Sequence, residues 1–309
     1  MTRFPLRSLA TVAVALALLG VACARTSAGG GGTSGGPSGG VSSPTPGITH
    51  PTGPDDLVLR VEQVGGFVPP TVTLVRLPSV SLFGDGRLIT EGAQTEIYPQ
   101  PALPPLLVQL LTEAGVQRIL ELARDSGLLE KDASYFQGGV ADAPTTVFTV
   151  NAGGGRHVVR ASALGFDRGP GSGHVLRGDL AALRALERFH GQLADPAAVL
   201  PAGSIGDSHP YELEALRLFV SPGAPSSSSG PDEPAVVWPL STPLAEFGTA
   251  VPDAGGLGPV RCGTVDGATL NELMPSVRRA TQISPWTSDG EAFEIVFRPL
   301  LPDESGCPS

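Results

Sequence analysis

Glycine and proline interrupt this chain at short intervals, with 41 Gly and 31 Pro among its 309 residues. An average protein carries about 12% of the two together, and inside a helix each Gly costs about 1 kcal/mol and each Pro about 3. A helical bundle or a long coiled coil is therefore excluded. A fully disordered chain is excluded as well, because 41% of the residues are hydrophobic. The sequence indicates a loop-rich globular body, in one large domain or two small ones.

The N-terminus has the features of an export signal. Two arginines precede an apolar stretch from Leu9 to Ala22, which is shorter than the roughly 20 residues that span a bilayer as a helix. This pattern predicts a signal peptide over residues 1–22. The residues Val21-Ala22-Cys23 resemble the lipobox of bacterial lipoproteins, which implies that Cys23 becomes the lipidated N-terminus on the outer face of the cell membrane. The alternative is an ordinary secretory signal that is cleaved nearby.

Residues 23–56 are predicted to form a flexible tether after this cysteine, because Gly, Ser, Thr and Pro dominate them and offer little apolar surface to bury. The whole chain carries 20 basic and 30 acidic residues. No basic stripe is available to neutralise phosphates, so nucleic acid is excluded as a partner. The acidic charge does not favour an anionic membrane surface either, so we expect membrane attachment through the lipid on Cys23.

Cys262 and Cys307 are an even pair once Cys23 is assigned to the lipid. They lie 45 positions apart. Exported proteins occupy compartments where disulfides persist, so we predict a bond between these two residues that ties the C-terminal tail to the body. A metal site or a catalytic thiol is the alternative, but the sequence has no CxxC motif and no Cys/His cluster to support it.

Alternating apolar residues from Leu57 onward predict an α+β fold, with mainly antiparallel strands and hairpins and about three amphipathic helices. Asp85-Gly86 indicates a tight hairpin, and parallel strands would need more helical crossovers than the chain offers. Helices are predicted where apolar residues recur at helical spacing, at residues 112–127, 179–193 and 266–277. Strands are predicted at residues 57–62, 71–76, 80–83, 87–90, 145–150, 156–161, 212–220, 235–238, 260–265 and 292–298.

Two halves are expected within this body. The first spans residues 57–193 and the second residues 211–307, with the boundary in the segment 194–210, which is rich in Ala, Pro, Gly and Ser. Both halves contain strands, a helix and a hairpin, which raises the hypothesis of two similar half-domains.

Common catalytic motifs are missing from the predicted body. It has no G-x-S-x-G elbow, and its single lysine, Lys131, has no Ser three residues before it, which excludes S-x-x-K acyl transfer, a P-loop and Schiff-base chemistry. No histidine pair has metal-binding spacing, and neither a metal nor a cofactor is predicted. The remaining candidates for acid–base chemistry are residues that more often lie solvated at a surface: His157, His174, His209, Glu91, Glu96, Asp303 and Glu304.

Aromatic residues make up only 5% of the chain, so their positions are informative. The chain has only two tryptophans, Trp238 and Trp286, and three tyrosines, one of which is Tyr211. We predict that Trp286 packs in a core beneath a hairpin; an apolar recognition patch at the surface is the alternative.

Four short segments resemble parts of uncharacterised exported lipoproteins of high-G+C bacteria, and they are spread over most of the predicted body. They are Leu82–Arg87, Leu111–Gln117, Trp286–Gly290 and Arg298–Glu304, which leads to Cys307. One lysine beside 19 arginines is consistent with such a genome. The resemblance implies export and a lipid anchor, but it implies no activity and no catalytic residue.

Two classes of function follow from these observations. The favoured class is a lipid-anchored, non-catalytic protein of the cell envelope that binds or displays a partner: a protein, a peptide or a wall component. The alternative is an envelope hydrolase whose site is built from residues scattered along the chain. A pocket with two or three convergent titratable groups favours the hydrolase, whereas apolar or edge-strand surfaces favour binding.

Overall fold

The computed structural model describes residues 47–136, 140–166, 177–224, 231–252 and 258–308. Contacts divide the chain into two units, Met1–Thr45 and Pro46–Ser309, and the second unit contains all of the described residues. The predicted signal peptide, Cys23 and the tether up to residue 46 lie outside the described residues, as does His174. What the sequence indicates about them stays a prediction.

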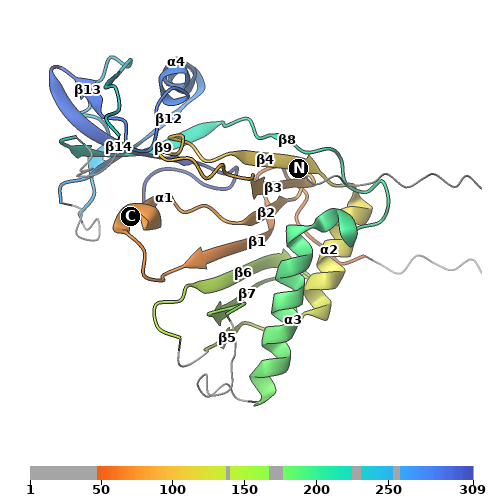
Figure 1. Ribbon diagram of the computed structural model, residues 1–309. Coiled ribbons are helices and arrows are strands. Elements are labelled where there is room, and N and C mark those ends of the chain that lie inside the picture. Colours follow the sequence, from red (N-terminus) through yellow and green to blue (C-terminus); the bar gives the residue numbers. More distant parts are fainter. Residues whose placement is uncertain (1–46, 137–139, 167–176, 225–230, 253–257, 309) are drawn as a thin grey trace, which may run out of the picture. The chain divides into compact units, whose positions relative to one another are not determined.

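The first of two sheets in this body has eight strands among the described residues, in the order β5-β7-β6-β1-β2-β3-β4-β8 (Figure 1). Neighbouring strands are antiparallel except for β5 and β7. Helices α2 (Glu113–Asp125) and α3 (Arg177–Ala194) lie along this sheet, and a short 3-10 helix, η1 (Pro196–Ala198), follows α3. The strands are β1 (Leu57–Val64), β2 (Val80–Phe83), β3 (Arg87–Glu91), β4 (Leu106–Leu110), β5 (Ala133–Tyr135), β6 (Thr145–Ala152), β7 (Gly155–Ser162) and β8 (His209–Pro210).

The second sheet has six strands in the described part of the chain, in the order β10-β13-β14-β9-β12-β11. Only β10 and β13 pair in parallel. Helix α4 (Gly267–Val277) packs on one face, and α1 (Pro70–Val75) contacts β14 on the other. The strands are β9 (Ala215–Pro222), β10 (Val236–Val237), β11 (Thr249–Ala250), β12 (Arg261–Asp266), β13 (Trp286–Ser288) and β14 (Glu291–Pro299).

The α+β class with mainly antiparallel strands is confirmed. The Asp85-Gly86 turn joins β2 to β3 as a hairpin, and Gly86 has a φ of 90°, which favours glycine. A second hairpin joins β6 to β7, as predicted. The two sheets differ in strand number and order, and the hypothesis of two similar half-domains stays a prediction.

Local signals explain where α2 begins and ends. The Thr112 hydroxyl accepts a hydrogen bond from the Gly115 backbone N–H at 3.4 Å, which satisfies one of the free donors at the helix start. The helix gives way to Gly127, whose φ of 86° lies in the left-handed region. Its apolar stripe is buried, as the spacing predicts.

The strand predicted at residues 71–76 is wrong, because Pro70–Val75 form the helix α1. Its sequence contains β-branched residues that favour a strand. Pro70, however, has a φ suited to the first helical turn, and Leu74 and Val75 are packed against a buried cluster of the second sheet. Tertiary packing therefore outweighs local propensity here.

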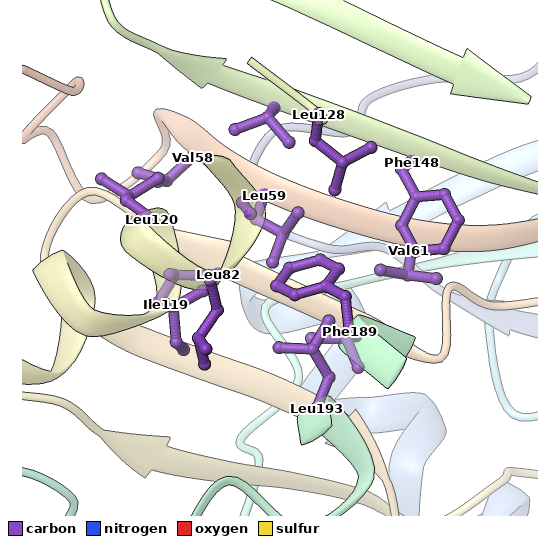
Figure 2. Close-up of a cluster of buried hydrophobic side chains, with 14 of the residues drawn as sticks. Val58, Leu59, Val61, Leu82, Ile119, Leu120, Leu128, Phe148, Phe189 and Leu193 are labelled. Atoms are coloured by element: carbon purple, nitrogen blue, oxygen red, sulfur yellow. The ribbon is translucent and has the colours of Figure 1, made fainter. Parts of the chain in front are cut away.

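The largest core lies between the first sheet and the helices α2 and α3 (Figure 2). Figure 2 shows Leu59 and Phe148 from the sheet, Ile119 and Leu120 from α2, and Phe189 from α3, all within one cluster. Each of these five side chains is almost fully buried. This single layer of contacts holds both helices on the sheet.

The second core lies between the second sheet and α4. Trp286 is fully buried there, with its ring centroid 6.0 Å from that of Trp238 and 5.4 Å from that of Phe297. The prediction that Trp286 belongs to a core is confirmed.

The C-terminal tail, residues 300–308, connects the two sheets. Leu301 packs in a cluster with Phe83 and Ile89 of the first sheet. Cys307 is bonded to Cys262 of β12, with a Cα to Cα distance of 6.0 Å, so the predicted disulfide is present.

The last residues assigned to the tether lie against this body. The Ile48 backbone N–H donates to Gln117 Oε1 at 2.7 Å, and Gln117 Nε2 donates to the Ile48 carbonyl at 2.9 Å. The Thr49 carbonyl accepts from the Gly153 N–H in the turn between β6 and β7. Residues 47–56 thus contact α2 and the first sheet, where the sequence predicts tether up to residue 56.

Candidate functional site

A cavity of about 730 Å³ lies between the two sheets. Its walls come from the end of β1, from α1 and the residues after it, from β14, and from the loop 92–105 that joins β3 to β4. Small-molecule sites have volumes of about 300 to 1,000 Å³ and set a few polar groups on mostly apolar walls. The polar residues on its walls include Gln63, Arg76, Glu91, Gln94 and Gln282.

The cavity lies where β2 no longer separates β1 from β3. Val80, the first residue of β2, pairs with both neighbouring strands. Beyond it, Gln63 at the end of β1 and Glu91 at the end of β3 both line the cavity, and the described residues place no strand between them. Pro78 explains why β2 does not continue, because proline has no N–H to give to a strand ladder.

The loop 92–105 reaches from the first sheet to the second. The Ala102 N–H donates to the Ala280 carbonyl at 3.0 Å, and the Gln282 N–H donates to the Gln100 carbonyl at 2.9 Å. The Gln100 side chain donates to the carbonyls of Ile97, at 2.8 Å, and of Thr95. The loop is therefore held both by itself and by the second sheet, which fixes one wall of the cavity.

Arg76, just after α1, supplies the positive charge of the cavity. Its Nη1 donates to the carbonyls of Gln63 at 3.2 Å and Gly65 at 2.9 Å, which holds the guanidinium against the end of β1. Among the described residues, Nε and Nη2 of Arg76 have no hydrogen-bond partner. The N–H groups of Nε and Nη2, which lie along one edge of the guanidinium, therefore remain available to an acceptor.

Glu91, the last residue of β3, supplies the negative charge. Its carboxylate has no hydrogen bond and no ion pair with any other described residue. The side chain keeps contact with solvent, yet desolvation by surrounding protein atoms raises the pKa of Glu91 above its ordinary value. An unpaired carboxylate in such surroundings gains from a hydrogen-bond donor or a cation.

Three glutamine side chains add neutral donors and acceptors. The amides of Gln63, Gln94 and Gln282 line the cavity, and none of them bonds to another side chain or backbone group in the described part of the chain. Each amide carries two donor hydrogens and an acceptor oxygen. The cavity thus presents hydrogen-bonding groups of both kinds in addition to its two charges.

The lining offers little for catalysis. The described residues that form its walls include no His, Cys, Lys or Tyr. The hydroxyl of Ser79 donates to the Val61 carbonyl at 3.1 Å, and the described lining residues include no histidine that could activate it. In the described part of the lining, Arg76 and Glu91 are the only titratable residues, and one carboxylate without a second acid is not a hydrolytic pair.

The structure does not bring the candidate histidines together. His157 lies half-buried on β7, the second strand in the order of the first sheet, and His209 is exposed on β8, the last. His174 lies outside the described residues. His157 and His209 therefore do not form a common site.

The candidate acids have three different environments. Glu91 lines the cavity, whereas Glu96 is exposed in the loop 92–105. Asp303 and Glu304 in the C-terminal tail are ion-paired, with Asp303 Oδ1 2.7 Å from Arg60 Nη2. The sequence predicts solvated charges for Asp303 and Glu304, and their ion pairs correct that expectation.

Tyr211 packs beside a buried cluster of the first sheet. Its hydroxyl is buried without a hydrogen-bond partner in the described residues, and burial, with smaller contributions from nearby charges, raises the pKa of Tyr211 to about 12. The group therefore stays protonated near neutral pH and is not a ready base.

Sequence reasoning identified Glu91 but missed Arg76 and the three glutamines. Gln63 lies just beyond a predicted strand and Arg76 at the end of a strand that does not exist. No local pattern connects them to Gln282, more than 200 positions along the chain. Only the packing of the two sheets brings these residues around one cavity.

A second hollow of about 430 Å³ lies beside residues 49–51 and the turn between β6 and β7. Its polar side chains are already engaged: His50 Nδ1 lies 2.7 Å from the Pro51 carbonyl, and His50 Nε2 lies 3.2 Å from Glu113 Oε1. Asn151 donates to the Leu57 carbonyl at 2.7 Å. These bonds secure the N-terminal segment, which makes this hollow a weaker candidate site.

The described residues show neither a membrane-spanning helix nor a metal-binding cluster. None of their helices combines the length and apolar character needed to cross a bilayer. No group of three or more His, Cys, Asp and Glu side chains in the same residues is arranged to hold a metal ion.

Comparison of the chain with protein-family models, with curated proteins and with solved structures found no match. The function therefore has to be inferred from the residues around the cavity.

Proposed function

We propose that this chain is a lipid-anchored, non-catalytic protein of the cell envelope that binds a small polar ligand in the cavity between its two sheets. The observation that carries the proposal is the set of unpaired polar groups on the cavity walls, led by Glu91. Gln63, Glu91, Gln94 and Gln282 are exposed to solvent, so their hydrogen-bonding groups are free to exchange water for a ligand. Binding rather than turnover is supported by the described lining residues, which include no His, Cys, Lys or Tyr and no second carboxylate beside Glu91.

The anchor part of the proposal is supported by the sequence of residues 1–46. The apolar segment ending at Ala22, the junction at Cys23 and the Gly/Ser/Pro-rich residues that follow fit a lipid anchor with a tether. Several acyl chains on one cysteine give stable membrane attachment, whereas a single chain does not.

The variant Cys23→Ser should move the protein from the membrane fraction to the soluble fraction, because serine at this position offers no thiol to acylate. Cell fractionation and intact-mass measurement test this expectation. The variant Ser27→Ala, which leaves the thiol unchanged, serves as the control and should stay with the membrane. If Cys23→Ser also stays there, the lipid anchor is wrong.

Filling the cavity should abolish ligand binding. Ala93 lines it, so Ala93→Trp places an indole in the ligand's space, whereas Ala197→Trp makes the same change at an exposed alanine of η1. A ligand at 100 times its Kd stabilises a protein by about 2.7 kcal/mol. We therefore expect the dialysable fraction of envelope extract to raise the Tm of the wild type and of Ala197→Trp, but not that of Ala93→Trp.

Three outcomes of this experiment would contradict the proposal. A wild-type Tm that does not respond argues against a small ligand in that fraction. An equal response of Ala93→Trp places the binding elsewhere. Conversion of a component of the fraction by the wild-type protein, seen by mass spectrometry, establishes the hydrolase instead.

A further inference from the structure

We propose that the ligand is a short peptide with both ends free, whose ammonium group pairs with Glu91 and whose carboxylate pairs with Arg76. This inference rests on the proposed function, since it names the ligand of the same cavity. Three features of the walls support it: two separate charges, neutral amides and the kind of apolar surface.

The two charges of the cavity do not neutralise each other. Arg76 is held by backbone carbonyls, and no ion pair joins it to Glu91. The remaining N–H groups of Arg76 suit a carboxylate, and the Glu91 carboxylate suits an ammonium group. A ligand that carries one charge of each sign at its two ends satisfies both residues at once.

The partial desolvation of Glu91 agrees with this pairing. Desolvation raises the pKa of Glu91 in the free protein, so its charged form is less stable than in water. A bound ammonium group would compensate that loss. Among the described lining residues Arg76 is the only cation, and it forms no ion pair with the carboxylate of Glu91.

The neutral groups match a peptide backbone. The amides of Gln63, Gln94 and Gln282 can each donate to a carbonyl and accept from an N–H. They come from the end of β1, from the loop 92–105 and from the segment between α4 and β13, so they surround the cavity on different sides. Between its two ends, a peptide carries backbone N–H donors and carbonyl acceptors in alternation, and these can pair with the glutamine amides.

The apolar walls favour a peptide over a saccharide. Aliphatic side chains and prolines dominate them, among them Val72, Val75, Leu103 and Pro104. Phe297, the one aromatic residue among the described lining residues, is only 3% exposed and therefore offers no open ring face to a sugar. The volume of about 730 Å³ suits a ligand of small-molecule size, which limits the peptide to a few residues.

Isothermal titration with tetraalanine tests the inference on the folded wild-type protein. Acetylation of its N-terminus removes the ammonium charge, and amidation of its C-terminus removes the carboxylate charge. We expect each change to weaken binding about tenfold or more, as for loss of a charge-assisted hydrogen bond. Peptides that bind equally well with and without these caps would overturn the inference.

Two matched variants assign the ammonium contact. In Glu91→Gln, acetylation should no longer change the affinity, because the carboxylate that distinguishes the two peptides is gone. In Glu96→Gln, an exposed position five residues away, the tenfold difference should remain. A difference that persists in Glu91→Gln contradicts the assignment.

The carboxylate contact is tested with Arg76→Gln, in which amidation should lose its effect. Because Arg76 also holds the end of β1, this variant can lose stability. In that case the amidated peptide on the wild-type protein still decides the question.

Different experimental results would contradict the peptide ligand and the binding function of the cavity. If tetraalanine does not bind while the dialysable envelope fraction still stabilises the wild type but not Ala93→Trp, the cavity binds something other than a peptide. Binding of chitotetraose in the place of tetraalanine would identify a saccharide site. If neither the fraction nor the peptide binds, both proposals are wrong.

Discussion

Replacement of Glu304 by Gln should lower the free energy of unfolding by about 3 to 5 kcal/mol at neutral pH, which is typical for breaking a buried ion pair. The Glu304 carboxylate lies 2.6 and 2.7 Å from Nη1 and Nη2 of Arg298, and it accepts from the Leu301 N–H at 3.0 Å. Arg298 is only 7% exposed. The substitution would leave its charge buried without a counterion.

Asp303→Asn is the matched control for this prediction. Asp303 lies in the same tail and pairs with Arg60, but its side chain is more exposed than that of Glu304. Asp303 accepts one hydrogen bond, from Arg60, whereas Glu304 accepts three, so we expect a smaller loss for Asp303→Asn. Urea unfolding of both variants and the wild type measures the two losses in free energy of unfolding. Equal losses would show that the Arg298–Glu304 pair stabilises the fold no more than the Arg60–Asp303 pair does.

The Glu304 pair also predicts how stability depends on pH. Burial alone would raise the pKa of Glu304, but the hydrogen bond and charge of Arg298, the Leu301 N–H and Arg60 outweigh it and lower the pKa below its ordinary value of 4.5. A lowered pKa gives stability that is present above the unfolded-state value and is lost as pH falls through the folded-state value. We expect the urea midpoint of the wild type to fall below about pH 4.5 more steeply than that of Glu304→Gln.

Removal of the Cys262–Cys307 bond should cost up to about 4 kcal/mol, because the bond closes a loop with a sequence separation of 45 residues. Cys307→Ala is the preferred variant, since Cys262 is buried and its thiol can stay in place. Ser305→Ala, at an exposed position of the same tail, serves as the control. Urea unfolding of the two variants, and of the wild type before and after reduction by dithiothreitol, measures the loss.

The disulfide and the Glu304 pair hold the same tail, so their effects should not add. Once Cys307 is released, part of the tail's order is already lost, and Glu304→Gln should cost less in Cys307→Ala than in the wild type. A double variant that loses the full sum would show that the two contacts act independently. A Cys307→Ala variant as stable as the wild type would contradict the role of the disulfide in stability.

The sequence by itself determined the features that depend on neighbouring residues. Thr112 and Gly127 marked the ends of α2, Asp85-Gly86 marked the hairpin of β2 and β3, and the even number of cysteines left after Cys23 indicated the disulfide. Caps, tight turns and alternation act over a few residues, so one segment is sufficient to recognise them.

The tertiary structure alone decided the features that depend on packing between distant segments. Residues 70–75 form a helix because Leu74 and Val75 meet the second sheet, although their β-branched neighbours favour a strand. Glu304 is an ion-pair partner because Arg298 lies beside it, and Arg76 and Gln282 line one cavity although no local pattern relates them. The free energy of such contacts depends on burial and on partners far away in the chain, which a local sequence pattern does not contain.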